Sequence, residues 1–487
     1  MIEDLAIEDK ARGATVPRLS RFGCLRLLSL LLAVLVALPV LVIIASWLHP
    51  QTEIWRHLAD TVLLRLLLNT LVLLLGVGIG VLLIGVGLAW LTAMCEFPGR
   101  RFFEWALLLP LAVPAYVLAF VALGTFDFTG PVQTLLRQHF GVGGYWFPEV
   151  RSRGGVIVVM VLVFYPYVYM LARAAFLTQG RATLEAARVL GYGPWGAFFH
   201  AVLPMARPAI ATGAAIALME TLADFGAVSV FNYDTFTTAI YKAWFGLFSL
   251  QAASQLASLL LLFVALALIS ERYLRRRARF HESPQAPKAH AIALHGWRAW
   301  LAFAAASMVF FFAFALPVWC LGSWAYKTFP GGIDVRYLEL LIHTLMLGAA
   351  AAVITIACAL LLAYARRRHA DRLTQTAIGA ATLGYALPGA VLAVGIMLVF
   401  TSLDNAFIAF MHWFDENWTG RLLGGTVVAL LLAYTVRFLA VAFGPIESGL
   451  GRIHPSLGEA ARNLGASPLE TVWRIHLPLL RPGLLTA

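Results

Sequence analysis

The chain has 487 residues, of which 61% are hydrophobic and 13% are charged. Globular proteins carry about 45–50% apolar and about 25% charged residues, so this composition excludes a disordered protein, a nucleic-acid module and an ordinary soluble enzyme. The net charge is +11, but only four of the 36 basic residues are lysine, and the arginines flank apolar runs. This pattern is typical of the cytoplasmic side of a polytopic membrane protein.

The first 23 residues are polar and contain Lys10, Arg12, Arg18 and Arg21. A helix needs about 20 apolar residues to cross a bilayer, so each apolar run of that length predicts one span. The first run is too long for the apolar part of a cleavable signal peptide. The predicted spans form two sets, at 24–48, 62–94, 104–124, 154–178, 207–230 and 250–270, and then at 298–326, 338–365, 376–402, 421–445 and the start of another at 479–487.

A basic, proline-containing stretch at 271–297 separates the two sets and is the predicted linker. With the N-terminal segment, 1–23, in the cytoplasm, alternation places this linker and nearly every other basic loop on the cytoplasmic side. The positive-inside rule requires that arrangement. The longer loops at 125–153 and 403–420 fall outside. The sequence therefore predicts an all-α, multi-pass membrane protein with a cytoplasmic N-terminus.

One long segment of the first set recurs in the second set. Residues 185–208 read EAARVLGYGPWGAFFHAVLPMARP, and residues 459–482 read EAARNLGASPLETVWRIHLPLLRP, at a constant offset of 274 residues (459 − 185). Two parallel copies of a unit of about six spans are therefore predicted, over 24–270 and 298–487. In parallel repeats of this kind a transport pathway is expected between the copies.

The second copy is shorter than the first. At the same offset Ala487 corresponds to Gly213, so the second copy lacks the counterpart of about 57 residues (270 − 213). From the symmetry of the repeat we expect the sequence to be a fragment or a prematurely ended reading frame, with a native length of roughly 545 residues. The second repeat is thus expected to be incomplete at its C-terminus.

The first repeated loop (181–208) is too polar to span and is expected to form two short cytoplasmic helices. The first covers Leu184–Leu190 and ends at Gly191, which suits a left-handed helix cap. The second covers about Pro194–His200, and Pro204 then opens the next span. A loop of this kind presents an amphipathic helix that can dock into a groove on a partner.

Small and acidic residues begin the repeated motif. Ala186 and Ala187 lack bulk, so the first helix can pack closely against the bundle, and Glu185 lies near a helix N-terminus, where negative charge is favourable. The second loop (455–482) repeats the scheme, and the matching residues are Glu459, Ala460, Ala461, Gly465 and Pro478.

The spacing of Glu185-Ala186-Ala187, Gly191 and Leu203-Pro204 resembles the EAA loop of ATP-binding-cassette (ABC) importer permeases. The second copy resembles it more closely, because Ala201 in the first copy stands where the family usually has isoleucine. The two-copy arrangement is similar to the fused permeases of the ferric-iron uptake group, over nearly the whole chain. This resemblance implies the type I importer permease fold in the bacterial inner membrane.

The resemblance also implies partners. In that family the second helix of each loop inserts into a separate ATPase subunit, which implies residues 192–200 and 466–474 as coupling helices. No lysine of this chain lies in a GxxxxGK[ST] phosphate-binding loop, so we expect a transport subunit that is not itself an enzyme. ATP and Mg²⁺ are expected on the partner ATPase, a dimer, and no cofactor in this chain. A periplasmic substrate-binding protein and membrane lipid complete the expected partners, without nucleic acid.

The stretch that begins at Glu220, ETLADFGAVSVFNYDTFTTAIYKAWF, resembles the corresponding region of ferric-iron permeases and implies ferric iron as the cargo. Glu220 and Asp224 lie one helical turn apart in an apolar stretch, and carboxylates at membrane depth are costly. They either line the pathway or bond to a neighbouring helix, and the sequence leaves both readings open. Thiamine, sulfate or polyamine import, and ion-coupled secondary transport, remain alternatives.

Other polar groups do not predict a metal site. His412, Asp415 and Glu416 fit an external interfacial loop with Trp413 and Trp418 at the headgroup level better than a metal cluster. The cysteines are isolated and predict small buried side chains; they are Cys24, Cys95, Cys320 and Cys358. Three closely spaced glycines in mid-span predict close helix packing rather than a nucleotide loop; they are Gly76, Gly78 and Gly80.

Overall fold

The structure is a computed structural model, and it describes residues 19–48, 52–141, 144–276, 292–328, 335–368, 371–382, 384, 387–415, 418, 420, 423–481 and 484. Within these ranges nearly all regular structure is helical, and ten helices are long and apolar enough to cross a membrane. The prediction of an all-α, multi-pass protein is therefore confirmed. Residues 1–18, most of the predicted linker, Glu416 and Pro482 lie outside the described residues.

Contacts divide the chain into two compact units. The larger unit takes residues 46–334 and 388–394, and the smaller unit takes residues 1–45, 335–387 and 395–487. Thus α2 (Leu19–Ala45), the first span, lies in the unit built from the second set of spans. Conversely, α15 (Trp297–Phe310) and α16 (Leu316–Thr328), which begin the second set, lie in the unit built from the first set. Division of the sequence at the linker does not predict that each of these helices belongs to the unit built from the other set of spans.

The larger unit contains most of the described helices. In chain order they are α3 (Thr52–Leu58), α4 (Leu64–Met94), α5 (Arg100–Ala106), α6 (Ala115–Phe126), α7 (Pro131–Phe140), α8 (Arg153–Ala175), α9 (Arg181–Val189), α10 (Pro194–Ala197), α11 (Leu203–Ala223), α12 (Gly226–Val230), α13 (Phe236–Tyr241), α14 (Leu250–Arg276), α15 and α16. Two short parallel strands, β1 (Cys95–Glu96) and β2 (Ile292–Ala293), tie the end of the linker to the end of α4.

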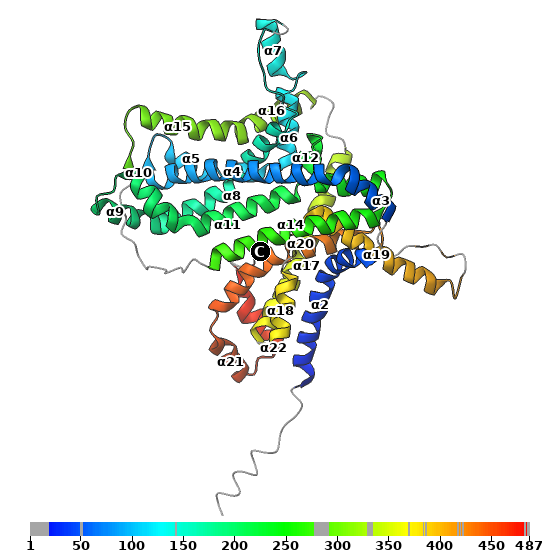
Figure 1. Ribbon diagram of the computed structural model, residues 1–487. Coiled ribbons are helices and arrows are strands. Elements are labelled where there is room, and N and C mark those ends of the chain that lie inside the picture. The colour runs from blue at the N-terminus through cyan, green and yellow to red at the C-terminus, as the bar shows by residue number, and fades with distance from the viewer. Residues whose placement is uncertain are drawn as a thin grey trace, which may run out of the picture. The chain divides into compact units, whose positions relative to one another are not determined.

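Helices α4, α8 and α11 run side by side at the centre of this unit (Figure 1). Glycines permit the close approach. A Cβ atom on Gly76 would lie 2.6 Å from the Ile157 side chain, and one on Gly213 would lie 2.8 Å from the Tyr167 carbonyl oxygen. At Gly213 the obstacle is backbone, so only glycine fits there, whereas a Cβ atom at Gly76 would displace the Ile157 side chain. Small residues are common at the packed faces of membrane helices. The predicted packing role of the mid-span glycines is confirmed for Gly76 and for Gly80, which meets Val161.

Prolines break two of the predicted spans. The expected span 104–124 is instead α5 followed by α6, separated by a segment that contains Pro110 and Pro114. Proline lacks the N–H that a continuous helix needs and disfavours the helical conformation of the residue before it. The expected span 376–402 is likewise divided, with Pro388 between its two helices. The prediction of continuous helices at these two places was wrong.

A third predicted span, 207–230, is also divided. Helix α11 ends at Ala223, Asp224 has the extended ψ of 130°, and the short α12 follows. Neither proline nor glycine lies at residue 224, so the local sequence gives no clear signal for this break.

The smaller unit contains, besides α2, helices α17 (Val335–Arg368), α18 (Arg372–Ala381), most of α19 (Gly389–Met411), α20 (Val427–Arg452), α21 (Pro455–Asn463), α22 (Pro468–Thr471) and α23 (Leu477–Leu479). Helices α17 and α20 pack along one another, and α2 packs on α18. At that contact Arg26 forms an ion pair with Asp371 at 3.1 Å, and Asp371 also caps α18 by accepting from the Thr374 N–H. These hydrogen bonds, with Arg26 nearby, hold the pKa of Asp371 below its usual range.

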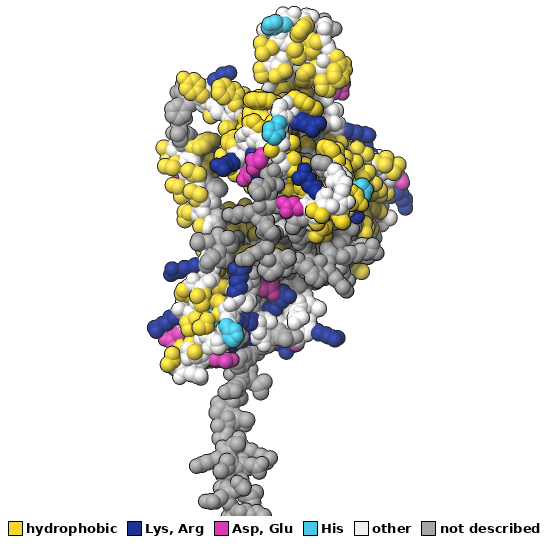
Figure 2. Space-filling view, turned by 90° about the vertical axis from the view of Figure 1, so that its left-hand side faces the viewer, with side chains coloured by type: hydrophobic (Ala, Val, Ile, Leu, Met, Phe, Trp, Pro, Cys, Tyr) yellow, Lys and Arg dark blue, Asp and Glu magenta, His cyan; other side chains and the backbone are white. Residues whose placement is uncertain are grey.

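Large apolar side chains are exposed along many of the described helices, and Figure 2 shows hydrophobic side chains over much of one face. Water cannot solvate so much apolar surface without cost, whereas lipid can. The exposed apolar surface is what a membrane-embedded protein requires.

Candidate coupling loops and intramembrane acidic pair

The first repeated loop contains α9, α10, and a π-helical turn at Phe198–Val202 that leads into α11. Between α9 and α10, Gly191 has a φ of +88°, which confirms the predicted left-handed cap. The Tyr192 N–H donates to the Ala187 carbonyl and the Gly191 N–H donates to the Arg188 carbonyl, each at 3.0 Å. This pair of bonds satisfies carbonyl groups that the end of the helix would otherwise leave unpaired.

The motif residues of α9 divide between an inner and an outer face. Ala187 is buried, together with Leu184, so the prediction of close packing holds for Ala187. Ala186 is exposed, as is Glu185, so that prediction is wrong for Ala186. Residues one turn apart share a helix face, which is why adjacent alanines cannot both point inward.

An aromatic cluster fixes the first loop to the bundle. The Phe198 ring lies 4.5 Å from Trp90 of α4 and 6.3 Å from Phe176, measured between ring centroids, and Trp90 and Phe176 are 6.0 Å apart. Phe176 and Phe198 are buried. Aromatic rings in edge-to-face contact attract one another beyond the area that they bury. The loop is therefore anchored by side chains without ionisable groups.

The second repeated loop has the same backbone design, with α21, α22 and a π-helical turn at Val472–His476. Gly465 has a φ of +88°, the value found at Gly191, and the Ala466 N–H donates to the Ala461 carbonyl at 3.0 Å. Ala461 is buried, whereas Ala460 and Glu459 are exposed. The two loops therefore agree in cap geometry and in which alanine packs inward.

Polar contacts fix the second loop. The Tyr364 hydroxyl lies 2.6 Å from Nδ1 of His476. The Arg367 guanidinium donates to the carbonyls of Leu450 (2.9 Å) and Ile453 (2.7 Å), at the end of α20, where a cation is favourable. Burial, and then the charges of Arg367 and Arg368, lower the pKa of His476 from its ordinary value of 6.5. The hydroxyl and the imidazole thus form a hydrogen bond in which either group can donate, according to the tautomer of the ring.

A reciprocal cap begins α22 in the second loop. The Ser467 N–H donates to Oε2 of Glu470 at 2.9 Å, and the Glu470 N–H donates to Oγ of Ser467 at 3.2 Å. These bonds, led by the one from the Ser467 backbone, hold the pKa of Glu470 below its usual range. The first loop has Gly193 and Gly196 at the corresponding positions, which have no side chains to form this capping box.

Both loops expose apolar side chains. Val189, Leu190 and Trp195 of the first loop are 88%, 77% and 69% exposed, and Leu464 and Trp473 of the second loop are 89% and 64% exposed. Exposed tryptophan is enriched among the residues that contribute most to protein–protein interfaces, and exposed apolar patches are typical of interaction surfaces.

The intramembrane acidic pair lies where α11 ends. Oδ2 of Asp224 accepts the Val228 N–H at 3.1 Å, and the Asp224 carbonyl accepts the Thr237 hydroxyl at 2.7 Å. Asp224 thus caps α12 and ties it to α13. Glu220 is half-buried one turn earlier in α11. These bonds give Asp224 a structural partner, and the role of either carboxylate in a pathway stays a prediction.

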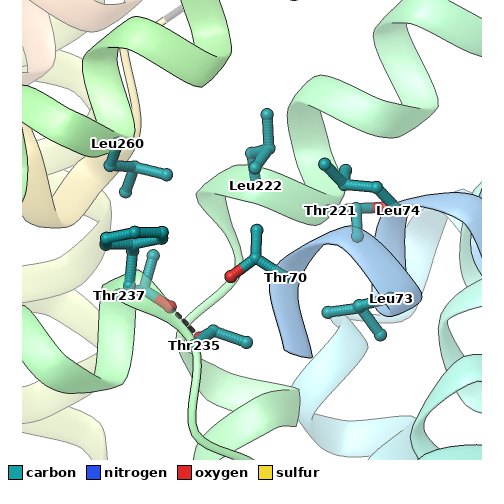
Figure 3. A pocket seen from close by; sticks show the side chains of 9 residues that line it. Thr70, Leu73, Leu74, Thr221, Leu222, Thr235, Thr237 and Leu260 are labelled. Carbon is teal, nitrogen blue, oxygen red and sulfur yellow. Dashed lines mark hydrogen bonds between the residues drawn. The ribbon is translucent and has the colours of Figure 1, made fainter. Parts of the chain in front are cut away.

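A small cavity lies beside this break, between α4, α11, α13 and α14 (Figure 3). Hydroxyls of Thr235 and Thr237 bond to each other at 2.9 Å on its wall, and the buried Thr70 hydroxyl has no hydrogen-bond partner within the described residues. The cavity volume is about 10 Å³, which is close to the space of one water molecule. It is therefore too small for a hydrated metal ion or any larger cargo.

The sequence missed the anchors of the two loops. Trp90 and Phe198 are 108 residues apart (198 − 90), and no local pattern pairs them. One signal was available, because the 274-residue offset matches Trp90 with Tyr364, and each of these side chains contacts its own loop. Among the described residues no group of three or more His, Cys, Asp or Glu side chains could hold a metal ion.

Comparison with known proteins agrees with these features. The family model described as binding-protein-dependent transport system inner membrane component matches residues 81–280 and 355–487, and so includes both repeated loops. The chain is 26% identical over 404 residues to the Fe(3+)-transport system permease protein FbpB 2 of Haemophilus influenzae, an alignment that covers 82% of this chain and 72% of the relative.

Two further relatives set the range of similarity. The ferric transport system permease protein FbpB of Actinobacillus pleuropneumoniae is 26% identical over 402 residues, 78% of this chain and 56% of the relative. The molybdenum transport system permease protein ModB of Escherichia coli is 32% identical over 185 residues, 37% of this chain and 79% of the relative. The chain therefore spans between about half and three quarters of the length of the ferric relatives.

Proposed function

The chain belongs to the family of binding-protein-dependent transport system inner membrane components, and we propose that it is the permease subunit of an ABC importer for ferric iron. In this role it receives cargo from a periplasmic binding protein and passes it to the cytoplasm. A separate ATPase subunit supplies the energy. The chain itself holds no cofactor, while ATP and Mg²⁺ bind to the ATPase, which we propose to be a dimer.

The two repeated loops are the proposed contacts with the ATPase. Residues 192–200 and 466–474 dock on it, with the exposed Trp195 and Trp473 among the buried contacts of the complex. The left-handed caps at Gly191 and Gly465 set the direction in which each docking helix leaves the bundle. The observation that carries this proposal is the equal φ of +88° at two glycines 274 residues apart.

Motion of the ATPase would reach the membrane through the anchors of the loops. Phe198 lies against Trp90 of α4, and the π-helical turn continues directly into α11. Helix α11 ends at the acidic pair, so the docking loop and the intramembrane carboxylates are at opposite ends of one helix. With docking on the cytoplasmic side, the N-terminus is also cytoplasmic, which accords with the positive-inside pattern.

Ferric iron is the proposed cargo because two relatives named as iron permeases align over most of this chain. Carboxylate oxygens such as those of Glu220 and Asp224 suit a hard cation, and they are the proposed lining of the pathway. Thiamine, sulfate and polyamine import are the alternatives within the same class. Ion-coupled secondary transport has no use for two docking loops.

Co-purification tests the class of protein. The chain, extracted with the ATPase encoded beside it, should form a complex that hydrolyses ATP. The Trp195→Ala/Trp473→Ala variant should lose most of the complex, whereas a variant at an exposed lipid-facing residue such as Leu83→Ala should keep it. Transport that persists without any ATPase would overturn the proposal in favour of ion-coupled transport.

The cargo is tested separately. The binding protein encoded beside this chain should bind Fe(III). Uptake of radioactive iron should fall in the Glu220→Gln/Asp224→Asn variant. Little folded protein should be lost, because amides keep the shape and the hydrogen bonding of the carboxylates. Equal uptake in the variant excludes the pathway role of the pair. If the binding protein instead holds sulfate, thiamine or a polyamine, that molecule is the cargo and iron is not.

A further inference from the structure

Helix α7 presents its apolar side away from the protein. A short corner, residues 127–130, joins α6 to α7. Helix α7 contacts few other elements, and none of its residues is buried. At helical spacing its apolar residues fall on one face, namely Val132, Leu135, Leu136 and Phe140. Leu135 and Phe140 are 56% and 62% exposed. A helix on the surface of a water-soluble protein has the reverse arrangement, because its polar face points toward the solvent.

The polar face of α7 is used to hold the corner. The Gln133 side chain donates to the Phe126 carbonyl at 2.9 Å, and the Arg137 guanidinium donates to the Phe128 carbonyl at 2.6 Å while it lies 4.3 Å from the Phe128 ring. Tyr145 from the following loop lies 3.3 Å from Gln133. These contacts hold Gln133 and Arg137 against the corner and so set the rotation of the helix, while Gln138 and His139 stay exposed.

The corner itself is built into the sequence. A Cβ atom on Gly130 would lie 2.5 Å from the Thr125 carbonyl oxygen, so glycine is required there. Asp127 accepts hydrogen bonds from Arg151 (3.0 Å) and from the Phe128 N–H (2.9 Å). In the second repeat the positions of Gly130 and Pro131 hold Asp404 and Asn405, and α19 continues through them as an unbroken helix. The outward helix is therefore a specific feature of the first repeat.

The direction of α7 agrees with a location in the membrane plane. Helix α7 extends across the direction of α4 and α8 in Figure 1, and the lobe at the same height in Figure 2 is mostly hydrophobic. The helix precedes the start of α8, whereas the first repeated loop follows its end, so α7 lies at the opposite end of the spans. Its surface continues from α6, whose Tyr116 and Phe120 are more than half exposed.

We propose that α7 is an interfacial helix that lies in the membrane leaflet opposite the coupling loops, with its apolar face against lipid acyl chains. The helix contains Arg137 and His139 but no acidic residue, a composition that anionic headgroups accept. Trp146, which is 86% exposed in the next loop, is suited to the headgroup level. The lipid contact holds the outer ends of α6 and α8 at a fixed depth.

Photocrosslinking in the full chain tests this proposal. Benzoylphenylalanine replaces Phe140 on the apolar face or, as the matched control, Gln138, which lies nearly opposite on the same helix and is also exposed. The protein is irradiated in vesicles of phosphatidylethanolamine and phosphatidylglycerol with the binding protein present, and adducts are identified by mass spectrometry. We expect about tenfold more lipid adduct at position 140 than at position 138, since only the apolar face enters the interface.

Two results would overturn the proposal. One is equal lipid labelling at both positions, and the other is an adduct of position 140 with the binding protein. A second measurement does not depend on the probe. Leu135→Glu/Phe140→Glu should increase protease cleavage within residues 127–152 of the membrane-reconstituted protein severalfold, whereas Gln138→Glu should leave it unchanged. Unchanged cleavage in the double variant contradicts a lipid contact.

Discussion

The two repeated loops have one backbone geometry and two different kinds of anchor. Both place a glycine at φ +88° after a nine-residue helix and pack the second alanine of the motif inward. The first loop is fixed by Trp90, Phe176 and Phe198, while the second is fixed by a hydrogen bond to a histidine and by an arginine that caps α20. The exposed backbone geometry is therefore the same in the two loops, and the contacts beneath it differ.

This difference separates what the two loops share from what they do not. The cap sets the direction of the proposed docking helix, and only a residue that tolerates positive φ can provide it. Any contact that holds the turn against the bundle can serve as the anchor, so aromatic and polar solutions are both possible. The choice has a consequence for pH, because the second anchor includes a histidine, whose pKa burial and the neighbouring arginines lower from its ordinary value of 6.5, whereas the rings of the first anchor do not ionise.

The largest effect is expected where the loops agree. Gly191→Val with Gly465→Val forces a β-branched residue into the left-handed region, at a cost of about 2 kcal/mol or more for each loop. A Cβ atom at either position would contact nothing within 4 Å, so the penalty arises from the backbone alone. Transport and association with the ATPase should be lost, while membrane insertion should persist.

Gly322→Val is the control for this experiment. Gly322 lies in α16, outside both loops, is equally free of neighbours within 4 Å, and does not have a positive φ. This variant should retain transport. Normal uptake in the double glycine variant would contradict the assigned role of the caps.

The second prediction distinguishes the aromatic anchor of the first loop from the polar anchor of the second loop. Phe198→Ala removes a buried ring that contacts Trp90, and such truncations cost about 3–5 kcal/mol. Hydrogen exchange of residues 181–202 should become much faster, by the same factor at pH 6 and pH 8. Val472 occupies the matching position in the second loop and is only half-buried, so Val472→Ala should have a much smaller effect. Equal effects of the two changes would show that the anchors do not differ.

A smaller, pH-dependent effect is expected in the second loop. The folded-state pKa of His476 lies below its ordinary value of 6.5. The stability that this group contributes is therefore present above about pH 6.5 and is lost as pH falls toward the lower folded-state pKa. The protection factors of residues 455–476, which correct exchange for its intrinsic pH dependence, should fall from pH 7.5 to pH 5.5, while those of residues 181–202 should not.

Removal of the phenol tests the cause of that pH effect. Tyr364→Phe deletes one hydrogen bond, worth about 1 kcal/mol, and should weaken the second loop already at pH 7.5. His476→Gln should abolish its extra pH sensitivity. A pH response that remains in His476→Gln would assign the titration to another group.

The sequence predicts the helical caps well because the signal is local. Glycine at residues 191 and 465 is sufficient to place a left-handed residue, and the number and rough limits of the spans follow from apolar length. The breaks at Pro110–Pro114 and before Gly389 were also readable, since proline interrupts helices. They were missed because hydropathy alone does not distinguish one broken span from one continuous span.

Other features depend on contacts between distant residues. The exchange of α2 and α15–α16 between the two units has no local signature, because these helices are apolar along their length and fit either unit equally by composition. The pairing of Arg26 with Asp371 spans 345 residues. The break at Asp224 depends on its carboxylate capping α12, which becomes evident only after α11 and α13 are placed.

The smallest effect concerns the capping box that only the second loop has. Ser467→Gly gives α22 the cap residue that α10 has, and such a replacement costs only about 0.3 kcal/mol. Gly193→Ser with Gly196→Glu transfers the box to the first loop, where a Cβ atom at residue 193 meets nothing and one at residue 196 meets only the Tyr192 side chain, at 3.3 Å.

The transferred box should depend on pH. Because bonds to Glu470 keep its folded-state pKa low, the contribution of the box is present above the unfolded-state pKa of the glutamate. That contribution is lost as pH falls through the lower folded-state pKa. The transferred box should therefore slow exchange of residues 194–197 slightly at pH 7 and lose that effect near pH 3. A gain that persists at pH 3 would arise from the serine alone, and no gain at all would mean that the first loop is already held entirely by its aromatic anchor.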